Sequence, residues 1–452
     1  MSPRVAVVGG GLSGLLAARA LSPDHEVTLF EAGPALGGAI GVVRLAGVLT
    51  DSGAESFAVA RPEARLLIDE LQLGDRVVAP TRSDAHLWRD DGLYALPVSL
   101  LGVPVDLRSP DVVAIIGTDE SERAAGLDAA PMRVPRSGET LGAMVRERMG
   151  DMVATYILTP VVAGVHAISP DLVEAEAVIP GIGAAMVREG SLSGAARALR
   201  AGGERPGAAV NGLDGGMSTL VRALERELSG VRVHTNTGVE RVVLDGRSWV
   251  VTSSVERVEV DFVVLAVPAP VAASILDVQS VAAPLSSIRV GDVAVVSLVV
   301  DCAGLDDAPV GSGVLVDPDQ SLVRAKALTH ATAKWAWLAR EFGPGRHLLR
   351  LSYGRDGVVA EPMDTLVEQA VRDASLIAQV RLGEPVDARV TRWPNSLVHA
   401  RSGHGELAAR VADAVADVPG LAVIGAGLGG NGIAGTVRRA STVGAQLDLM
   451  GG

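Results

Sequence analysis

The sequence predicts a mixed α/β protein that combines a Rossmann-like unit, an antiparallel sheet and a helical insertion. Three observations predict this fold class. A short apolar run at residues 4–9 ends in glycines and is followed by a helix-forming segment. Apolar residues alternate at residues 293–300 and 347–353, and residues 111–210 are rich in Ala, Gly and Pro. These patterns are typical of a βαβ unit, of an antiparallel sheet and of short helices, respectively.

Length and composition restrict the class of protein. The 452 residues are enough for two or three domains, and 48% hydrophobic with 21% charged residues excludes an intrinsically disordered chain. The net charge of −13 argues against nucleic-acid binding, because a basic surface is needed to displace counterions. The single cysteine, Cys302, excludes an intramolecular disulfide and a thiolate-clustered metal site. The histidines lack metal-ligand spacing, so we expect no metal.

The sequence contains no segment suited to cross a membrane. The best candidate, residues 262–276, is shorter than the roughly 20 residues required and is interrupted by Pro268 and Pro270. The apolar N-terminus resembles a signal peptide, but the glycine spacing described below explains it better. Residues 94–107 leave room for peripheral membrane contact, although a buried loop with a short strand is the favoured interpretation. With a single cysteine, the sequence predicts a cytoplasmic protein.

The first half of the chain is predicted to hold two strands with a helix between them, then a surface helix and a mainly helical insertion. The strands are expected at residues 4–9 and 26–30, and the helices at residues 12–21, 62–73 and 140–149. Prolines divide the insertion into short helices.

The second half begins with a helix for which Ser218 is the expected N-cap. Further strands are expected at residues 231–235, 239–244, 249–253, 258–267, 293–300, 347–353 and 421–424, and helices at residues 364–378 and 436–449. Because the sequence contains no internal repeat and no low-complexity linker, we expect domains that are discontinuous in sequence. The first comprises residues 1–83, 211–282 and 395–452, the second residues 84–107 and 283–394, and the third, helical domain residues 108–210.

A glycine fingerprint follows the first strand. Gly9, Gly11 and Gly14 match GxGxxG, in which the glycines allow the turn, the approach of a pyrophosphate and helix–strand contact. Glu31 lies 31 − 9 = 22 residues after Gly9, close to the roughly 20 expected for a carboxylate that binds a ribose hydroxyl. A tight turn without a ligand is the alternative. An acidic residue disfavours NADP, so the pattern predicts NAD or FAD.

The glycines that follow favour FAD. Gly37 and Gly38 come after the second strand and would bring a second backbone segment against the pyrophosphate, as in flavoproteins of the amine oxidase superfamily. A second GxGxxG begins at Gly425, but only 22 residues follow Gly430, too few for another Rossmann half. We interpret it as a glycine-rich closing loop that returns to the flavin.

Several longer segments occur in the order seen in one family. They are GLDGGMSTLVRAL, DFVVLAVPAPVAASIL, Arg392–Trp393 and Gly403–His404. The chain resembles oxygen-dependent protoporphyrinogen and coproporphyrinogen III oxidases of the Gram-positive and actinobacterial type along nearly its whole length. This resemblance implies a para-hydroxybenzoate-hydroxylase-like FAD domain, made by the first group of residues above, and a substrate domain made by the second. It also implies oxidation of a porphyrinogen by O2, with H2O2 as product, in haem biosynthesis. The fingerprint, Glu31 and the lack of a suitably placed cysteine predict noncovalent FAD. The acidic chain, for which we expect no membrane anchor, favours coproporphyrinogen III as the substrate.

The resemblance also implies which residues hold the cofactor. Those expected at the ADP half are Gly9, Gly10, Gly11, Leu12, Ser13, Gly14, Glu31, Ala32, Gly37 and Gly38, with the backbone of Val239 at the adenine. Those expected at the flavin are Gly53, Ala54, Glu55, Ser56, Trp393, Asn431, Gly432 and Ile433. A core position for Trp393 is the alternative. The flavin accepts the hydride, and the sequence identifies no general base.

The chain departs from the family pattern at several positions. Ala39 replaces a basic residue, SLVHARSGH lacks a Pro-Gln-Tyr segment, GIAGTV lacks a proline and a cysteine, and Asp84–Ala85 stands where an arginine is common. Three alternatives therefore stay open: a protoporphyrinogen IX oxidase, another flavin oxidoreductase such as an amine oxidase or desaturase, and a catalytically silent FAD-binding paralogue. An aromatic content of 3% disfavours the aromatic cage of an amine oxidase.

The basic residues suggest where an anionic substrate binds. Among 40 basic residues only Lys326 and Lys334 are lysines, and both lie in RAKALTHATAKWAW. Because a chain with net charge −13 repels a polycarboxylate, we expect at least one of them to bind a propionate or to order its neighbours. Ordinary surface lysines are the alternative. The expected partners are the porphyrinogen and O2, with handover to the next haem-pathway enzyme left open.

Overall fold

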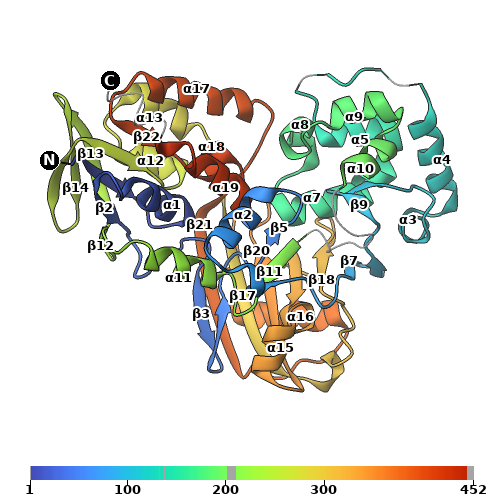
Figure 1. Cartoon of the computed structure of the whole chain (residues 1–452). Helices are drawn as coiled ribbons and strands as arrows, with labels where there is room; N and C mark the ends of the chain where they lie inside the picture. The colour runs from blue at the N-terminus through green and yellow to red at the C-terminus, as the bar shows by residue number, and fades with distance from the viewer. Residues whose placement is uncertain (1, 132, 137, 201–209, 445–452) are drawn as a thin grey trace.

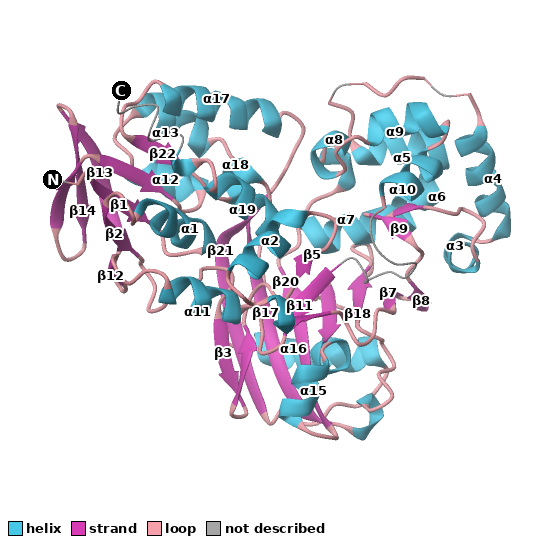
Figure 2. Cartoon of the chain, in the orientation of Figure 1, coloured by secondary structure: helices cyan, strands magenta, loops and turns pink. Residues whose placement is uncertain are grey.

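The computed structural model describes residues 2–131, 133–136, 138–200 and 210–444. Figure 1 shows a parallel sheet with its helices on the left, a group of helices on the upper right and a large sheet at the bottom. Figure 2 shows the same division by secondary structure, with the right-hand part almost wholly helical. The predicted mixed α/β class is confirmed.

The parallel sheet is assembled from distant parts of the chain. Its order is β12-β2-β1-β16-β22, and each neighbouring pair is parallel. The strands are β1 (Arg4–Val8), β2 (Glu26–Phe30), β12 (Arg232–His234), β16 (Phe262–Leu265) and β22 (Leu421–Val423). Val5 and Val7 face one hydrophobic cluster and Ala6 and Val8 the other, so β1 is buried on both sides. Burial on both faces is typical of a parallel strand.

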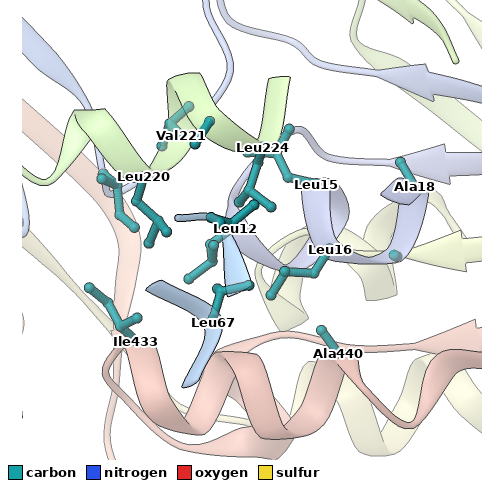
Figure 3. Packing of buried hydrophobic residues seen from close by; sticks show 14 of the residues in the cluster. Leu12, Leu15, Leu16, Ala18, Leu67, Leu220, Val221, Leu224, Ile433 and Ala440 are labelled. Atoms are coloured by element: carbon teal, nitrogen blue, oxygen red, sulfur yellow. The ribbon is translucent and has the colours of Figure 1, made fainter. Parts of the chain in front are cut away.

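Four helices cover the first face of this sheet: α1 (Leu12–Leu21), α2 (Pro62–Glu70), α11 (Ser218–Arg226) and α19 (Ile433–Ala440). Figure 3 shows Leu12 of α1 among side chains from the other three helices, such as Leu67, Leu220 and Ile433. These helices come from both ends and the middle of the chain. The glycine turn before α1 is therefore supported by a hydrophobic core to which distant segments contribute. The second face is covered by α12 (Ala269–Ile275), α13 (Gln279–Ser286), α17 (His404–Ala416) and the sheet of β13 (Val239–Asp245), β14 (Ser248–Ser253) and β15 (Arg257–Val260).

The large sheet has seven strands in the order β21-β17-β20-β19-β18-β7-β8. They are β7 (Ala85–Arg89), β8 (Gly92–Ala95), β17 (Val290–Asp301), β18 (Gly313–Val316), β19 (Ala327–His330), β20 (Arg346–Tyr353) and β21 (Asp387–Val398). The expected antiparallel pattern is correct except that β18 and β7 pair in parallel. One face packs on α16 (Leu366–Ala378), through residues such as Val296 and Leu351. At the lower end lie α14 (Ala331–Lys334) and α15 (Ala336–Phe342).

The helical insertion has its own hydrophobic cluster, which includes Leu141, Val145 and Ile157. Its helices are α3 (Pro110–Ile116), α4 (Thr118–Ala129), α5 (Leu141–Met149), α6 (Asp151–Val153), α7 (Thr159–His166), α8 (Ala175–Val178), α9 (Ile182–Glu189) and α10 (Leu192–Leu199). Short strand pairs and triplets join the units: β3 (Val42–Leu45) with β4 (Val48–Asp51), β9 (Ser99–Leu100) with β10 (Val103–Pro104), and β5 (Phe57–Ala58) with β11 (Val210–Leu213) and β6 (Val77–Val78).

Several predicted elements need correction. The single strand expected at residues 258–267 is two strands, β15 and β16, in different sheets, with Asp261 between them. Ser218 is the first helical residue rather than the N-cap, because the Asp51 carboxylate caps α11 instead, accepting hydrogen bonds from the backbone N–H groups of Met217 (3.1 Å) and Ser218 (3.2 Å).

The C-terminal region also differs from its prediction. The closing loop contains one helical turn, α18 (Ala426–Gly429), and the last helix, α19, begins at Ile433 and ends at Ala440 instead of spanning residues 436–449. Residues 445–449 of that prediction lie outside the described residues. Within the described parts of the chain, no helix is long and apolar enough to cross a membrane.

Candidate cofactor and substrate site

At two positions in the turn between β1 and α1, the surrounding backbone leaves no space for a side chain. Gly9 has φ +103°, and a Cβ there would lie 2.7 Å from the carbonyl oxygen of Ala266. A Cβ on Gly14 would lie 1.8 Å from the carbonyl oxygen of Gly9. Any other residue at these two positions would therefore collide with backbone.

Gly11 differs from its neighbours because its conformation suits any residue. It is the N-cap of α1 with φ −69° and ψ 179°, and a Cβ there would meet only the Cα of Gly38, at 3.8 Å. No side chain caps α1, so its first N–H groups face this open space. Free N–H groups at a helix N-terminus form an anion site. The turn therefore leaves a cradle that a side chain at position 11 would fill.

Gly37 and Gly38 lie against the turn at Gly10 and Gly11. Gly11 and Gly37 form a parallel β-bridge, and the N–H of Gly37 donates to the carbonyl of Gly10 at 2.8 Å. A Cβ on Gly38, which has φ +55°, would lie 3.0 Å from the Cα of Gly11. The structure thus brings together the two backbone segments that the sequence predicts at a pyrophosphate.

Glu31 lies at the carboxyl end of β2, beside the turn. Its carboxylate accepts hydrogen bonds from the N–H groups of Gly10 (2.7 Å) and Gly33 (2.6 Å). The N–H of Thr237 donates to the carbonyl of Glu31 at 2.8 Å, and a Cβ on Gly238 would lie 3.8 Å from that of Ala32. The predicted ribose carboxylate and the predicted adenine contact, Val239, therefore belong to adjoining segments.

The other predicted cofactor residues divide into two groups. Leu12, Ser13 and Ile433 are buried, and Leu12 and Ile433 point into the helical core, so only their backbones are available to a ligand. Asn431 holds the end of β21, accepting from the N–H of Val398 at 2.9 Å and donating to its carbonyl at 2.7 Å. The side-chain position next to it, at Gly432, is open, since a Cβ there meets nothing within 4 Å. This loop therefore leaves room beside the N-terminus of α19.

Trp393 packs on the loop after β4. Its indole N–H donates to the carbonyl of Ser52 at 3.3 Å, and a Cβ on Gly53 would lie 3.1 Å from its ring and 2.2 Å from the carbonyl of Ala39. The side chain is half-buried rather than part of the core. Trp393 thus connects the large sheet to the segment Gly53, Ala54, Glu55 and Ser56 that the sequence predicts at the flavin.

A buried ion cluster strengthens this connection. Glu55 accepts hydrogen bonds from the ammonium of Lys334 at 2.6 Å and from the guanidinium of Arg350, which also donates to the carbonyl of Gly53 at 2.6 Å. Burial raises the pKa of Glu55, but the charges of Lys334 and Arg350 outweigh burial and hold this pKa at about 2. Burial raises the pKa of nearby Asp51 to about 6, despite its hydrogen bonds to Met217 and Ser218.

Sequence reasoning missed Arg350 and Asp51. A signal for Arg350 was available: it is an arginine in the middle of RHLLRLSY, a strand that is otherwise apolar at its centre. A cation at such a position needs a partner, but the sequence does not show that the partner comes from a loop 295 residues away. Asp51 gave no local signal, because its two donors lie in another segment.

One face of the large sheet is left partly open. Directly paired residues of antiparallel strands share a face, so Arg350 lies with Ser297 and Thr329, and Trp393 lies with Val293. On this face Val293, Val295, Thr329 and Ser352 are half-exposed although they belong to central strands, and so is Trp393 on the edge strand β21. The opposite face is buried under α16. The open face adjoins Gly53 and is the candidate substrate surface.

The two lysines have different surroundings. Lys334 is 15% exposed at its side chain, paired with Glu55, and lies 5.0 Å from the centre of the Trp335 ring. Lys326 is 4% exposed, and among the described residues its ammonium has no hydrogen-bond or ion-pair partner. The alternative of two ordinary surface lysines is therefore wrong. Lys334 forms an ion pair inside the protein, whereas Lys326 has none among the described residues.

A separate hollow of about 360 Å³ lies in the helical insertion, between residues such as Val134, Met144 and Val187. It contains none of the predicted site residues. Within the described ranges, no group of three or more His, Cys, Asp or Glu residues is placed to hold a metal ion.

Comparison with known proteins agrees with this geometry. A model of the flavin-containing amine oxidoreductases matches residues 12–443, so the chain belongs to this family of flavin-dependent oxidoreductases. Coproporphyrinogen III oxidase of Mycobacterium tuberculosis is 34% identical, with 96% of this chain and 95% of that protein covered, and the Bacillus subtilis enzyme is 25% identical, with 95% and 94% covered. The crystal structure of a "putative protoporphyrinogen oxidase" from Exiguobacterium sp. 255-15 has a TM-score of 0.88 at 25% identity, covering 99% of both chains. The resemblance predicted from motif order is confirmed.

Proposed function

We propose that this protein oxidises coproporphyrinogen III to coproporphyrin III with noncovalent FAD and O2, producing H2O2, as a step in haem biosynthesis. The observation that carries the proposal is the open sheet face beside Gly53 and Trp393, in a chain related to coproporphyrinogen III oxidases over nearly its whole length. A flat, partly polar surface of this kind suits a large macrocycle with acidic side chains.

The residues fit FAD. The open cradle at Gly11 and the free N–H groups of α1 would hold the pyrophosphate, and Glu31 would bind a ribose hydroxyl. Trp393 and the Gly53–Ser56 segment would position the flavin ring against the sheet. Cys302 packs with the cluster beneath α16, on the buried face of the sheet, which supports noncovalent binding. When bound, FAD supplies hydride acceptance and reoxidation by O2.

Charge favours coproporphyrinogen III over protoporphyrinogen IX. The four carboxylates of coproporphyrinogen keep it soluble in water, and a chain without a candidate spanning helix in its described parts gives no apolar route for the less polar substrate. Local cations such as Lys326 offset the net charge of −13.

The test is a visible spectrum of the purified protein followed by porphyrin fluorescence after addition of each porphyrinogen. We expect a flavin spectrum and a higher kcat/KM for coproporphyrinogen III than for protoporphyrinogen IX. A clear preference for protoporphyrinogen IX would reverse the substrate assignment. Bound flavin with no turnover of either substrate would identify a catalytically silent paralogue or an oxidoreductase of another substrate class.

A further inference from the structure

Lys326 is held rigidly in the sheet without a counter-ion. Its N–H donates to the carbonyl of Ser352 at 2.8 Å, and its carbonyl accepts from the N–H of Val316 at 3.0 Å. The backbone is thus fixed between β18 and β20. A buried ammonium without an acceptor costs several kcal/mol of stability by general estimates. A residue of this kind is unexplained by the fold alone.

The buried acid that holds the backbone next to Lys326 bonds to other groups. Asp373 of α16 accepts hydrogen bonds from the N–H groups of Ala325 (2.8 Å) and Arg324 (3.2 Å), from the Tyr353 hydroxyl (3.0 Å) and from Gln369 (2.7 Å). Oδ2 accepts three of these hydrogen bonds and Oδ1 accepts the one from Gln369, and neither oxygen pairs with the ammonium of Lys326. The internal counter-ion that a structural lysine would need is therefore missing among the described residues.

His399 is a second buried group with an unused polar atom. It is 4% exposed, and its Nε2 is buried with no hydrogen-bond partner. The imidazole lies against two glycines, since a Cβ on Gly291 would be 2.7 Å from Nε2 and a Cβ on Gly357 would be 2.6 Å from Cε1. His399 belongs to SLVHARSGH, the segment that departs from the family pattern. Its ring is therefore fixed against the two glycines, and Nε2 lacks a hydrogen-bond partner among the described residues.

Arg355 connects these two groups. Its guanidinium donates to the carbonyl of Ala325 at 3.0 Å, next to Lys326. Burial lowers the pKa of Lys326 to about 8, and the charge of Arg355 lowers it as well. Burial also lowers the pKa of His399, with further contributions from Arg401 and Lys326 and an opposing one from Asp356. Lys326 is thus within electrostatic range of both Arg355 and His399.

We propose that Lys326, Arg355 and His399 form a carboxylate-binding subsite that receives one propionate of the porphyrinogen. The inference rests on the proposed function for the identity of the ligand. A carboxylate satisfies the ammonium and the imidazole N–H together, and its negative charge offsets the two cations. Around Arg355 lie the acids Asp317, Asp356, Glu361 and Asp373, which favour a monovalent group over a more highly charged anion.

The test compares Lys326→Met and His399→Leu with Arg324→Met, which removes an exposed cation two residues away. We expect Lys326→Met to raise the KM for coproporphyrinogen III, and the Kd of coproporphyrin III measured by fluorescence quenching, by roughly ten- to a hundredfold. Arg324→Met should change both by less than about twofold. The flavin content should stay unchanged in every variant, and Lys326→Arg should retain most of the affinity.

Two further readouts separate binding from a structural role. Ligand-free Lys326→Met should melt at the same or a higher temperature than the wild type, because an unpaired buried charge has been removed. In the wild type, kcat/KM should fall as the pH rises past about 8, where Lys326 loses its proton, and Lys326→Arg should lack this decline.

Failure of the inference and failure of the proposed function are distinguishable. If the wild type oxidises coproporphyrinogen III while Lys326→Met and His399→Leu keep its KM and Kd, only the subsite is overturned. If the wild type oxidises neither porphyrinogen, the proposed function fails, and coproporphyrin III then tests the subsite directly. If coproporphyrin III raises the melting temperature of the wild type but not that of Lys326→Met, the subsite is supported. Equal shifts in the two proteins would overturn the subsite.

Discussion

Gly11 and Gly14 illustrate how one residue type serves two purposes within a single turn. Gly14 is required because a Cβ would collide with the carbonyl of Gly9 at 1.8 Å. Gly11 has an ordinary conformation and open space around its Cα, so the fold itself would accept a side chain there. The backbone therefore does not explain the absence of a side chain at position 11, and we propose that a ligand does.

This difference makes Gly11→Val a specific test of the cofactor site. The valine would fill the cradle in front of α1, so we expect a folded protein that is purified without flavin. Gly14→Ala is the contrasting variant and should destabilise the protein itself, because its Cβ has no space. Visible absorbance gives the flavin content, and circular dichroism with a thermal melt reports folding. Normal flavin content in Gly11→Val would contradict the assignment of the cradle.

At the level of elements, the sequence predicted what depends on local pattern. The strand at Glu26–Phe30 and the helix at Leu12–Leu21 have the predicted bounds, because apolar periodicity and glycine position determine them locally. The cap of α11 was not predictable, since Asp51 is far from Ser218 in the sequence. The break at Asp261 was missed because residues 258–267 are apolar on both sides of it.

The same distinction applies to the candidate site. The glycine turn and Glu31 were predicted because their chemistry is contained in one βαβ unit. Arg350 and the partner of Lys334 were not, because the contacts join β20 and α14 to the loop after β4. A charged residue within an apolar strand can be noticed in the sequence, but the sequence does not show which distant residue is its ion-pair partner.

Glu55 is the residue through which these elements are joined, so Glu55→Gln should destabilise the protein. At pH 7 we expect a loss of about 3–5 kcal/mol, because Lys334 and Arg350 keep their charges without a carboxylate. The pKa of Glu55 is lowered to about 2, so its contribution is present above about pH 4.5 and is lost as the pH falls towards 2. The difference between wild type and variant should therefore shrink over that interval.

Urea unfolding of both proteins at a series of pH values measures this difference. Glu55→Gln combined with Lys334→Met is the control, and it should recover part of the loss at pH 7 because one unpaired cation is removed. A stability difference that is the same at pH 7 and at pH 3 would show that the negative charge of Glu55 is not responsible.

At the level of the whole molecule, the hydrophobic clusters fall into parts that resemble the expected domains. One cluster lies under α1 and α19, one within the helical insertion, and one between the large sheet and α16. The exact division at residues 83, 107, 210, 282 and 394 stays a prediction. At the candidate site the parts are joined by the ion cluster at Glu55 and by the contact of Trp393 with Ser52, beside a hydrophobic cluster that includes Leu45, Trp335 and Leu348. A ligand between these parts therefore adds contacts to more than one of them.

This arrangement predicts that removing the flavin destabilises more than the glycine turn. FAD would contact α1 and the loop before α19 and also Trp393 of the large sheet, so it binds the folded arrangement of two units. For a ligand at 100 to 1,000 times its Kd the stabilisation is about 3–4 kcal/mol, which for a chain of this length corresponds to a shift in melting temperature of roughly 3–5 °C. We expect flavin-free protein to melt lower by this amount and to recover when FAD is added. Gly11→Val is the matched control: it should melt with the flavin-free wild type and should not respond to FAD, whereas equal melting temperatures for holoprotein and apoprotein would contradict a flavin site shared by the two units.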